Sequence, residues 1–161
     1  MASERISPPE SRLLCGREKE LARLAEIAAA AAAGRGSCLL IAGESGLGKS
    51  RLLREAAARL PMRLLTARCD TRTSTSYQPV AALMRQMLEG PGRLKRPAAV
   101  EPLLSGAPEA GPAADAADAD GSHAPQLREA IVAFFRQAAA NGPLALAIED
   151  LQRADHATLD L

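Results

Sequence analysis

The sequence predicts an α/β fold in which a parallel sheet is covered by helices. Three observations carry this prediction. Short apolar runs alternate with segments whose apolar residues recur at helical spacing. A glycine-rich loop joins the first apolar run to a helical segment, and the last apolar run ends in two acids. Both features fall at the carboxyl ends of expected strands, where sheets of this kind bind ligands.

Length and composition are those of a single globular domain. The chain has 161 residues, and its aromatic content of 2% leaves Leu, Val, Ile and Ala to build the core. We expect a flexible tail over residues 1–11 and one domain over residues 12–161. The net charge of +1 gives no electrostatic footprint for nucleic acid. Widely spaced cysteines and the lack of a leader or membrane-length apolar run predict a cytoplasmic protein without membrane contact.

The first half of the chain predicts helix, strand, loop and helix in that order. Arg17–Ala33 carries apolar residues at helical spacing and ends at Gly34. The apolar run Cys38–Ala42 is typical of a buried strand. Arg51–Leu60 is amphipathic, and Pro61 stops it.

The loop between that strand and helix, Gly43–Ser50, fits the phosphate-binding pattern G-x-x-x-x-G-K-[ST]. Glycines let the backbone curl so that several N–H groups face one anion. Lys49 can place its charge on the β- and γ-phosphates, and the Ser50 hydroxyl can bind Mg²⁺. We therefore expect these residues to bind the nucleotide: Gly43, Glu44, Ser45, Gly46, Leu47, Gly48, Lys49, Ser50 and Arg51.

The second half of the chain predicts two further strands and two long helices. Gly90–Pro125 is rich in Pro, Gly, Ala and Asp, which predicts a low-complexity insertion over about residues 90–125 with at most a short helix near Ala98–Leu104. The other expected elements are a strand at Met62–Ala67, a loop at Cys69–Tyr77, a helix from Pro79 to Glu89, a helix at Gln126–Ala140 and a strand at Leu144–Ile148.

Two acids, Glu149 and Asp150, follow the last apolar run directly. With a phosphate-binding loop upstream, this pattern resembles a Walker B segment, in which one acid supports Mg²⁺ and a second can orient or deprotonate water. Many strands end in an acidic turn, so the pattern gains its meaning from the loop.

Together these segments resemble the ATPase domain of signal-transduction ATPases with numerous domains (STAND), especially large LuxR-type ATP-binding transcriptional regulators and Orc-like AAA modules. The resemblance is carried by Leu14–Leu21, the loop with Arg51-Leu52-Leu53, Ala67-Arg68-Cys69, Tyr77–Val80 and Pro143–Asp155. One departure is Leu151-Gln152-Arg153-Ala154-Asp155, where the family often has His and Trp before Ala-Asp.

The resemblance implies a P-loop NTPase fold of the ASCE/AAA type with ATP and Mg²⁺ as cofactors. It implies that Arg17 lies near the adenine, that Lys49 contacts phosphates and that Ser50 and Glu149 serve Mg²⁺. Asp150 takes the position of the catalytic acid. Effector domains or self-association would be the partners, without direct nucleic-acid binding.

The same resemblance predicts an incomplete sheet. Family members continue past the position of Leu161 with a sensor strand that lies between the loop strand and the acidic strand. Without it those two strands would leave a gap, pair directly or borrow a strand from a partner. We therefore expect ATP binding with weak or absent hydrolysis, which leaves enzyme activity an open question.

Three alternative functions remain at this stage. A P-loop kinase acting on a small molecule would show acceptor-dependent phosphate transfer. A DNA-loading AAA ATPase would show salt-dependent DNA binding. An inert remnant of a longer regulator would show no thermal shift with MgATP.

Overall fold

The computed structural model describes residues 16–70, 76–90, 94–105 and 123–161. Its contacts group into two compact units, Met1–Leu60 and Pro61–Leu161, and each is described by itself. The prediction of one domain over residues 12–161 stays a prediction. The expected tail over residues 1–11 lies outside the described residues, as do residues 91–93 and 106–122 of the expected insertion.

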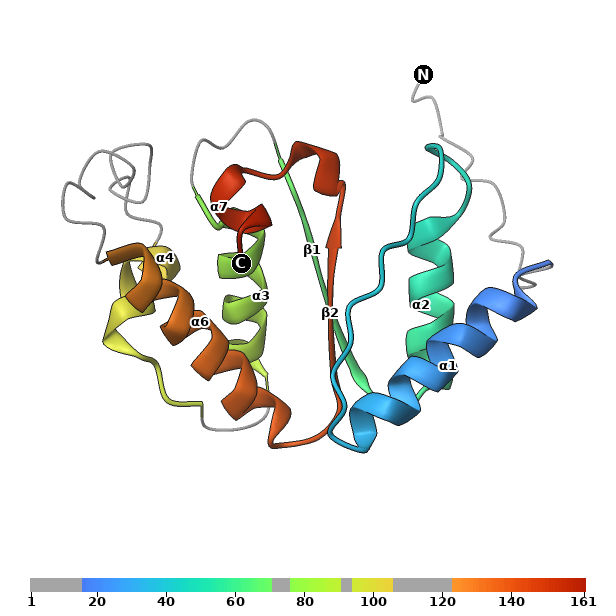
Figure 1. The fold of residues 1–161 in the computed structure, drawn as a ribbon, viewed down its shortest axis with the longest axis horizontal. Helices are drawn as coiled ribbons and strands as arrows, with labels where there is room; N and C mark the ends of the chain where they lie inside the picture. The colour runs from blue at the N-terminus through green and yellow to red at the C-terminus, as the bar shows by residue number, and fades with distance from the viewer. Residues whose placement is uncertain (1–15, 71–75, 91–93, 106–122) are drawn as a thin grey trace, which may run out of the picture. The chain divides into compact units, whose positions relative to one another are not determined.

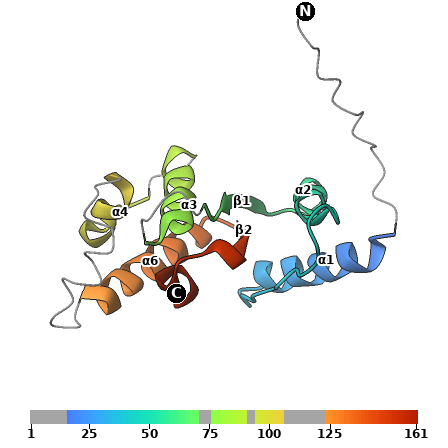
Figure 2. The same ribbon diagram turned by 90° about the horizontal axis from the view of Figure 1, so that it is seen from above.

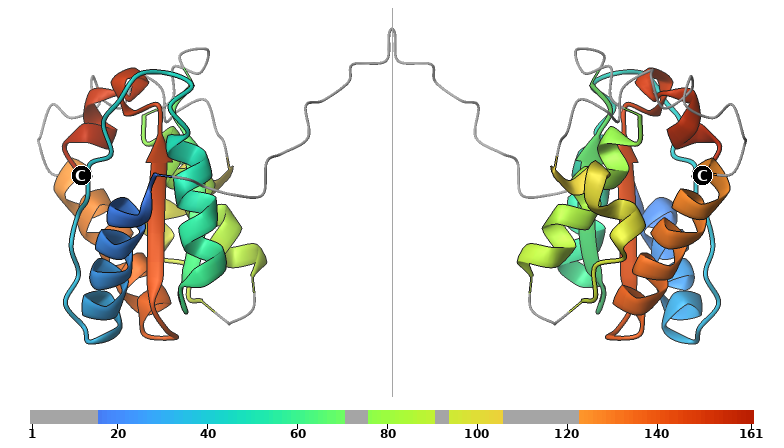
Figure 3. Two further views of the ribbon diagram at one scale, coloured as in Figure 1. Left: turned by 90° about the vertical axis from the view of Figure 1, so that its right-hand side faces the viewer. Right: turned by 90° about the vertical axis from the view of Figure 1, so that its left-hand side faces the viewer.

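The first unit consists of two helices joined by an extended segment and a glycine-rich loop (Figure 3). Helix α1 spans Glu18–Ala32 and helix α2 spans Lys49–Arg59, which confirms both helices predicted here. Alanines favour α1 strongly, and Gly34 follows it with a φ of 77°, the left-handed value that lets the chain turn away. The buried residues of the two helices are Ala28, Leu52 and Ala56.

The strand predicted at Cys38–Ala42 is wrong for this structure. The segment has no strand assignment, and the sheet among the described residues contains only β1 and β2. Leu39 and Leu40 are 42% and 75% exposed. Apolar composition predicts burial, but a strand exists only when its backbone groups pair with a neighbour.

The second unit holds a two-stranded parallel sheet. Strand β1, Arg63–Arg68, pairs with β2, Leu144–Glu149, in a register that sets Arg63 opposite Leu144 and Arg68 opposite Glu149. These two strands confirm the strands predicted at Met62–Ala67 and Leu144–Ile148. The α/β class therefore holds, with a small sheet in place of the wider one expected.

Helices lie together on one side of β1 and β2 within this unit (Figures 1 and 2). Helix α3 spans Gln78–Glu89 and helix α6 spans His123–Ala139, so the predicted helices are found, with α6 beginning three residues earlier than Gln126. Short elements complete the unit: η1 at Ala98–Val100, α4 at Glu101–Ser105, η3 at Leu151–Arg153 and α7 at His156–Leu159.

The core of this unit forms between α3, α6, β1 and the short η1–α4 segment. The apolar stripe of α3 is buried, with Val80, Leu83 and Met84 at 2% exposure or less. Phe134 of α6 is fully buried and meets Phe135 edge-on at 5.5 Å between ring centroids. Val100 and Leu103 are also buried, so this part of the expected insertion is a packed element of the core.

None of the helices described is long and apolar enough to cross a bilayer.

Candidate functional site

The glycine-rich loop of the first unit has the backbone that its sequence predicts. Gly46 and Gly48 have φ values of 86° and 78°, which residues with a Cβ atom rarely adopt. Gly48 is the residue that precedes α2, and its carbonyl accepts from Leu52 N–H at 2.9 Å to open the helix. The loop therefore turns sharply and passes directly into a helix.

The start of α2 is left open. No side chain caps it, and its first turn contains no acidic residue. The first N–H groups of a helix have no intrahelical acceptor, and the helix dipole makes this end positive. Residues Gly43 to Leu47 of the loop are exposed, as is Ser50. The loop and helix start thus present backbone N–H groups and positive potential, which suits a phosphate.

Lys49 folds back over the loop. Its Nζ donates to the carbonyl oxygens of Gly43 at 2.7 Å and Glu44 at 2.8 Å. These bonds hold the ammonium inside the curve of the loop. Ser50 and Arg51 follow it in the first turn of α2, Ser50 exposed and Arg51 partly buried.

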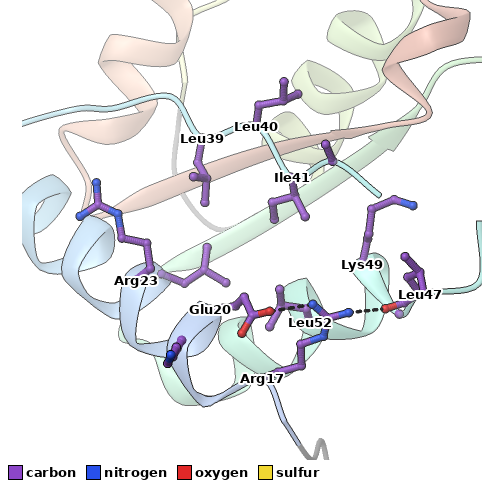
Figure 4. Close-up of a pocket in the computed structure, with 13 residues that line it drawn as sticks. Arg17, Glu20, Arg23, Leu39, Leu40, Ile41, Leu47, Lys49 and Leu52 are labelled. Atoms are coloured by element: carbon purple, nitrogen blue, oxygen red, sulfur yellow. Dashed lines mark hydrogen bonds and ion pairs between the residues drawn. The ribbon is translucent and has the colours of Figure 1, made fainter. Parts of the chain in front are cut away.

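A cavity of about 400 Å³ adjoins this loop within the first unit (Figure 4). Its size falls in the range of small-molecule sites, and most of its wall is apolar. One wall is α1, the second is the extended segment and the third is the loop with the start of α2. The lining residues are Arg17, Lys19, Glu20, Arg23, Leu24, Leu39, Leu40, Ile41, Ala42, Leu47, Gly48, Lys49 and Leu52.

Arg17 joins α1 to the loop. Its Nη1 donates to Glu20 at 2.7 Å, and its Nη2 donates to the carbonyl oxygen of Leu47 at 3.0 Å, as the dashed lines in Figure 4 show. The hydrogen bond from Arg17 lowers the pKa of Glu20 below its usual value. The family resemblance implied that Arg17 lies near the adenine. Its hydrogen bond to the Leu47 carbonyl has no signal in the sequence, because the two residues are far apart in the chain.

The two acids lie at the end of β2 in the second unit. Glu149 is the last residue of the strand, and Asp150 follows with a φ of 56°, a left-handed conformation that Asp adopts more readily than most residues. Arg68, at the end of β1, contacts both: its Nη2 lies 3.2 Å from Glu149 Oε2 and its Nε 3.2 Å from Asp150 Oδ2. Sequence reasoning assigned no role to Arg68.

Asp155 ties the segments beyond the two strands together. Its Oδ1 accepts from the N–H of Thr158 at 2.8 Å, which caps α7, and from the N–H of Tyr77 at 3.3 Å. Cys69 is buried close by, and burial together with the charges of Asp155 and Asp150 raises the pKa of its thiol. The Ala-Asp that trails the acids therefore has a structural task.

The described residues contain no cluster of three or more His, Cys, Asp or Glu side chains arranged to hold a metal ion. The oxygen donors that the sequence assigned to Mg²⁺, from Ser50 and Glu149, are of the chemical type that Mg²⁺ prefers. Mg²⁺ in nucleotide sites commonly takes one or two carboxylates and completes its shell with phosphates and water. The donor chemistry therefore fits an ion that arrives with a nucleotide.

The structure brings the predicted site residues together in two groups. Residues 43–51 and Arg17 lie together in the first unit, and Glu149 and Asp150 lie together in the second. The role of each residue toward a nucleotide stays a prediction.

A family model described as an AAA ATPase domain matches residues 13–161 of the chain. Searches among curated proteins and among solved structures gave no significant match.

Proposed function

The chain belongs to the AAA ATPase domain family, and on that premise we propose that it binds MgATP through the loop at Gly43–Ser50. The observation that carries the proposal is the uncapped, acid-free start of α2 directly behind this loop. An anion placed there meets several backbone donors and the positive end of the helix dipole together.

Each loop residue has a task in this proposal. Lys49 gives up its hydrogen bonds to the Gly43 and Glu44 carbonyls and donates to the β- and γ-phosphates instead. A phosphate oxygen is a stronger acceptor for an ammonium than a neutral carbonyl. The Ser50 hydroxyl supplies an oxygen to Mg²⁺, and backbone N–H groups from Glu44 to Arg51 hold the phosphates. The nucleoside extends into the cavity between α1 and the extended segment, where Arg17 forms part of the wall.

Glu149 supports Mg²⁺ and Asp150 orients or deprotonates the attacking water. Mg²⁺ bound there would neutralise charge on the phosphates. Both acids are ion-paired with Arg68, which occupies carboxylate oxygens that a metal ion or a water would otherwise contact. We therefore propose that hydrolysis is weak or absent and that the chain works as a nucleotide-dependent switch of a signalling or transcriptional regulator in the cytoplasm. Its partners would be effector domains or further copies of the chain.

The test is a titration of ATP into wild type and Lys49→Ala, followed by calorimetry. Loss of the ammonium should weaken binding at least about tenfold, as removal of a charge-assisted bond predicts. Lys95→Ala is the matched control because Lys95 is exposed and lies outside the cavity. Equal ATP affinity in wild type and Lys49→Ala would contradict the proposal.

The hydrolysis part is tested separately by phosphate release. Turnover at ordinary enzyme rates, roughly 1 s⁻¹ or more, with loss in Lys49→Ala, would overturn weak hydrolysis while leaving ATP binding intact.

A further inference from the structure

The cavity beside the phosphate-binding loop is lined by side chains of two kinds. Most of its wall is aliphatic, and none of the described residues that line it is aromatic. The polar lining side chains are those of Arg17, Lys19, Glu20, Arg23 and Lys49. Arginine and lysine only donate hydrogen bonds, whereas an ionised carboxylate only accepts them. Among the described side chains of this wall, Glu20 is therefore the one hydrogen-bond acceptor.

Glu20 is held in a set position relative to the loop by Arg17. Arg17 Nη1 donates to Glu20 Oε1 at 2.7 Å, and Nη2 donates to the Leu47 carbonyl oxygen at 3.0 Å. The two dashed lines in Figure 4 join Glu20, Arg17 and Leu47 in this order. Because the guanidinium is planar and rigid, it fixes the carboxylate on one side and the loop carbonyl on the other. The acceptor thus lies one guanidinium away from the loop that binds the phosphates in the proposed function.

One carboxylate oxygen of Glu20 remains for a ligand. A carboxylate has two oxygens with about four acceptor sites, and the described side chains donate only to Oε1, from Arg17. The hydrogen bond from Arg17 lowers the pKa of Glu20, so the carboxyl is ionised at neutral pH. The side chain is 40% exposed, which leaves Oε2 within reach of a molecule in the cavity.

We propose that Glu20 determines the base specificity of the site by accepting a hydrogen bond from an exocyclic amino group of the base, the N6 amino group in ATP. The inference rests on the proposed binding of the nucleotide through the loop, with its nucleoside in the cavity. The aliphatic wall favours every base alike, because burial of apolar surface is non-directional. An amino group is a donor and finds its side-chain acceptor at Glu20, whereas a keto oxygen there would be repelled by the carboxylate.

The test compares ATP with purine riboside triphosphate, which differs from ATP in lacking the amino group. Calorimetry of the full chain with Mg²⁺ gives both affinities, and their ratio is the readout. Wild type should bind ATP about three- to tenfold more tightly, as expected for one hydrogen bond to a charged acceptor that water partly screens at 40% exposure. Equal affinities in wild type overturn the inference.

Glu20→Gln separates recognition of the base from support of Arg17. The guanidinium still requires an acceptor, so the amide oxygen stays with Arg17 and the amide nitrogen, which only donates, faces the base. The ratio should therefore fall to about one. If Glu20 merely held Arg17 in place, both affinities would fall together and the ratio would stay at its wild-type value, which overturns the inference. A loss of folded protein leaves the ratio unchanged, because both nucleotides are measured on the same sample.

Glu26→Gln is the matched control. Glu26 lies on the same helix, pairs with Arg23 at 2.8 Å and does not line the cavity. Its ratio should equal that of wild type. A ratio that also falls to about one in this variant overturns the inference, because the loss of a carboxylate outside the cavity would then be enough.

The dependence on Lys49 separates this inference from the proposed function. If Lys49→Ala weakens ATP binding while wild type does not distinguish the two nucleotides, the inference fails and the proposed function stands. If ATP binds equally to wild type and Lys49→Ala, the proposed function fails and the inference fails with it.

Discussion

Single side chains connect the candidate binding loop to its surroundings, and Arg17 is the clearest case. It directly precedes α1, and its hydrogen bond to the Leu47 carbonyl joins two walls of the cavity. Because the guanidinium donates to both Glu20 and the Leu47 carbonyl, it holds the loop against α1.

Arg17→Ala should therefore weaken ATP binding by roughly three- to tenfold, the loss expected when one hydrogen bond that orders the loop is removed. Calorimetry measures this. Arg59→Ala is the control, because Arg59 in the same unit pairs with Glu55 and lies outside the cavity. An Arg17→Ala affinity equal to that of Arg59→Ala would show that the brace does not matter.

Cys38 and Cys69 should differ sharply in reactivity. Cys38 is exposed and Cys69 is buried, with a raised pKa. The thiolate is the reactive form, so at pH 8 iodoacetamide should alkylate Cys69 at least about tenfold more slowly than Cys38. A raised pKa also means that the contribution of Cys69 to stability is present below pH 9 and is lost as pH rises through the folded-state pKa.

Peptide mass spectrometry over a time course gives both rates, and thermal unfolding between pH 8 and 10 follows the second effect. Comparable alkylation of the two thiols in folded protein would contradict the burial of Cys69.

At the scale of elements, helix α2 and its loop form one functional piece. Gly48 has a φ of 78°, and a Cβ built on it would meet no atom within 4 Å. A substitution there is opposed by backbone strain alone, since the space is open. This makes Gly48 a clean probe of the loop conformation.

Gly48→Ala should destabilise the chain by about 1–2 kcal/mol and weaken ATP binding, because the loop must leave its left-handed conformation to relieve the strain. Gly36→Ala is the control, since Gly36 also has open space and lacks a left-handed φ. Urea unfolding and calorimetry measure the two effects. If both variants unfold and bind alike, the loop does not require this conformation.

Across the whole molecule, the sequence predicted the long helices and two of the three expected strands, and it was wrong about the third strand. The α3 stripe and the inward face of α6 follow from 3.6-residue spacing, and both are buried. The apolar run at Cys38–Ala42 looks like β1 and β2 in composition, yet it has no strand assignment. Pairing depends on a partner far along the chain, which composition does not name.

The candidate site divides in the same way. The loop residues could be predicted because all of them lie in one short segment whose spacing is itself the recognisable pattern. Arg68 could not, since its contact with Glu149 and Asp150 arises from sheet register and a left-handed turn. Long-range partners of this kind require coordinates.

The two compact units have unequal cores, and this predicts how the chain can be divided. The large hydrophobic cluster, with Phe134 and Met84 fully buried, belongs wholly to residues 61–161. The described part of the other unit, residues 16–60, carries the loop, the cavity and few buried apolar side chains. A fragment of residues 61–161 should therefore unfold cooperatively by itself. Its midpoint should not respond to MgATP, because the phosphate-binding loop lies in the other unit.

Phe134→Ala in that fragment should cost about 3–5 kcal/mol, the usual range for a fully buried aromatic side chain. Val132→Ala on the same helix is the control, since Val132 is 37% exposed and should change stability far less. Scanning calorimetry and urea unfolding decide both points. A thermal shift of the fragment with MgATP would place the nucleotide site in the second unit, and a non-cooperative transition would mean that its core needs residues 1–60.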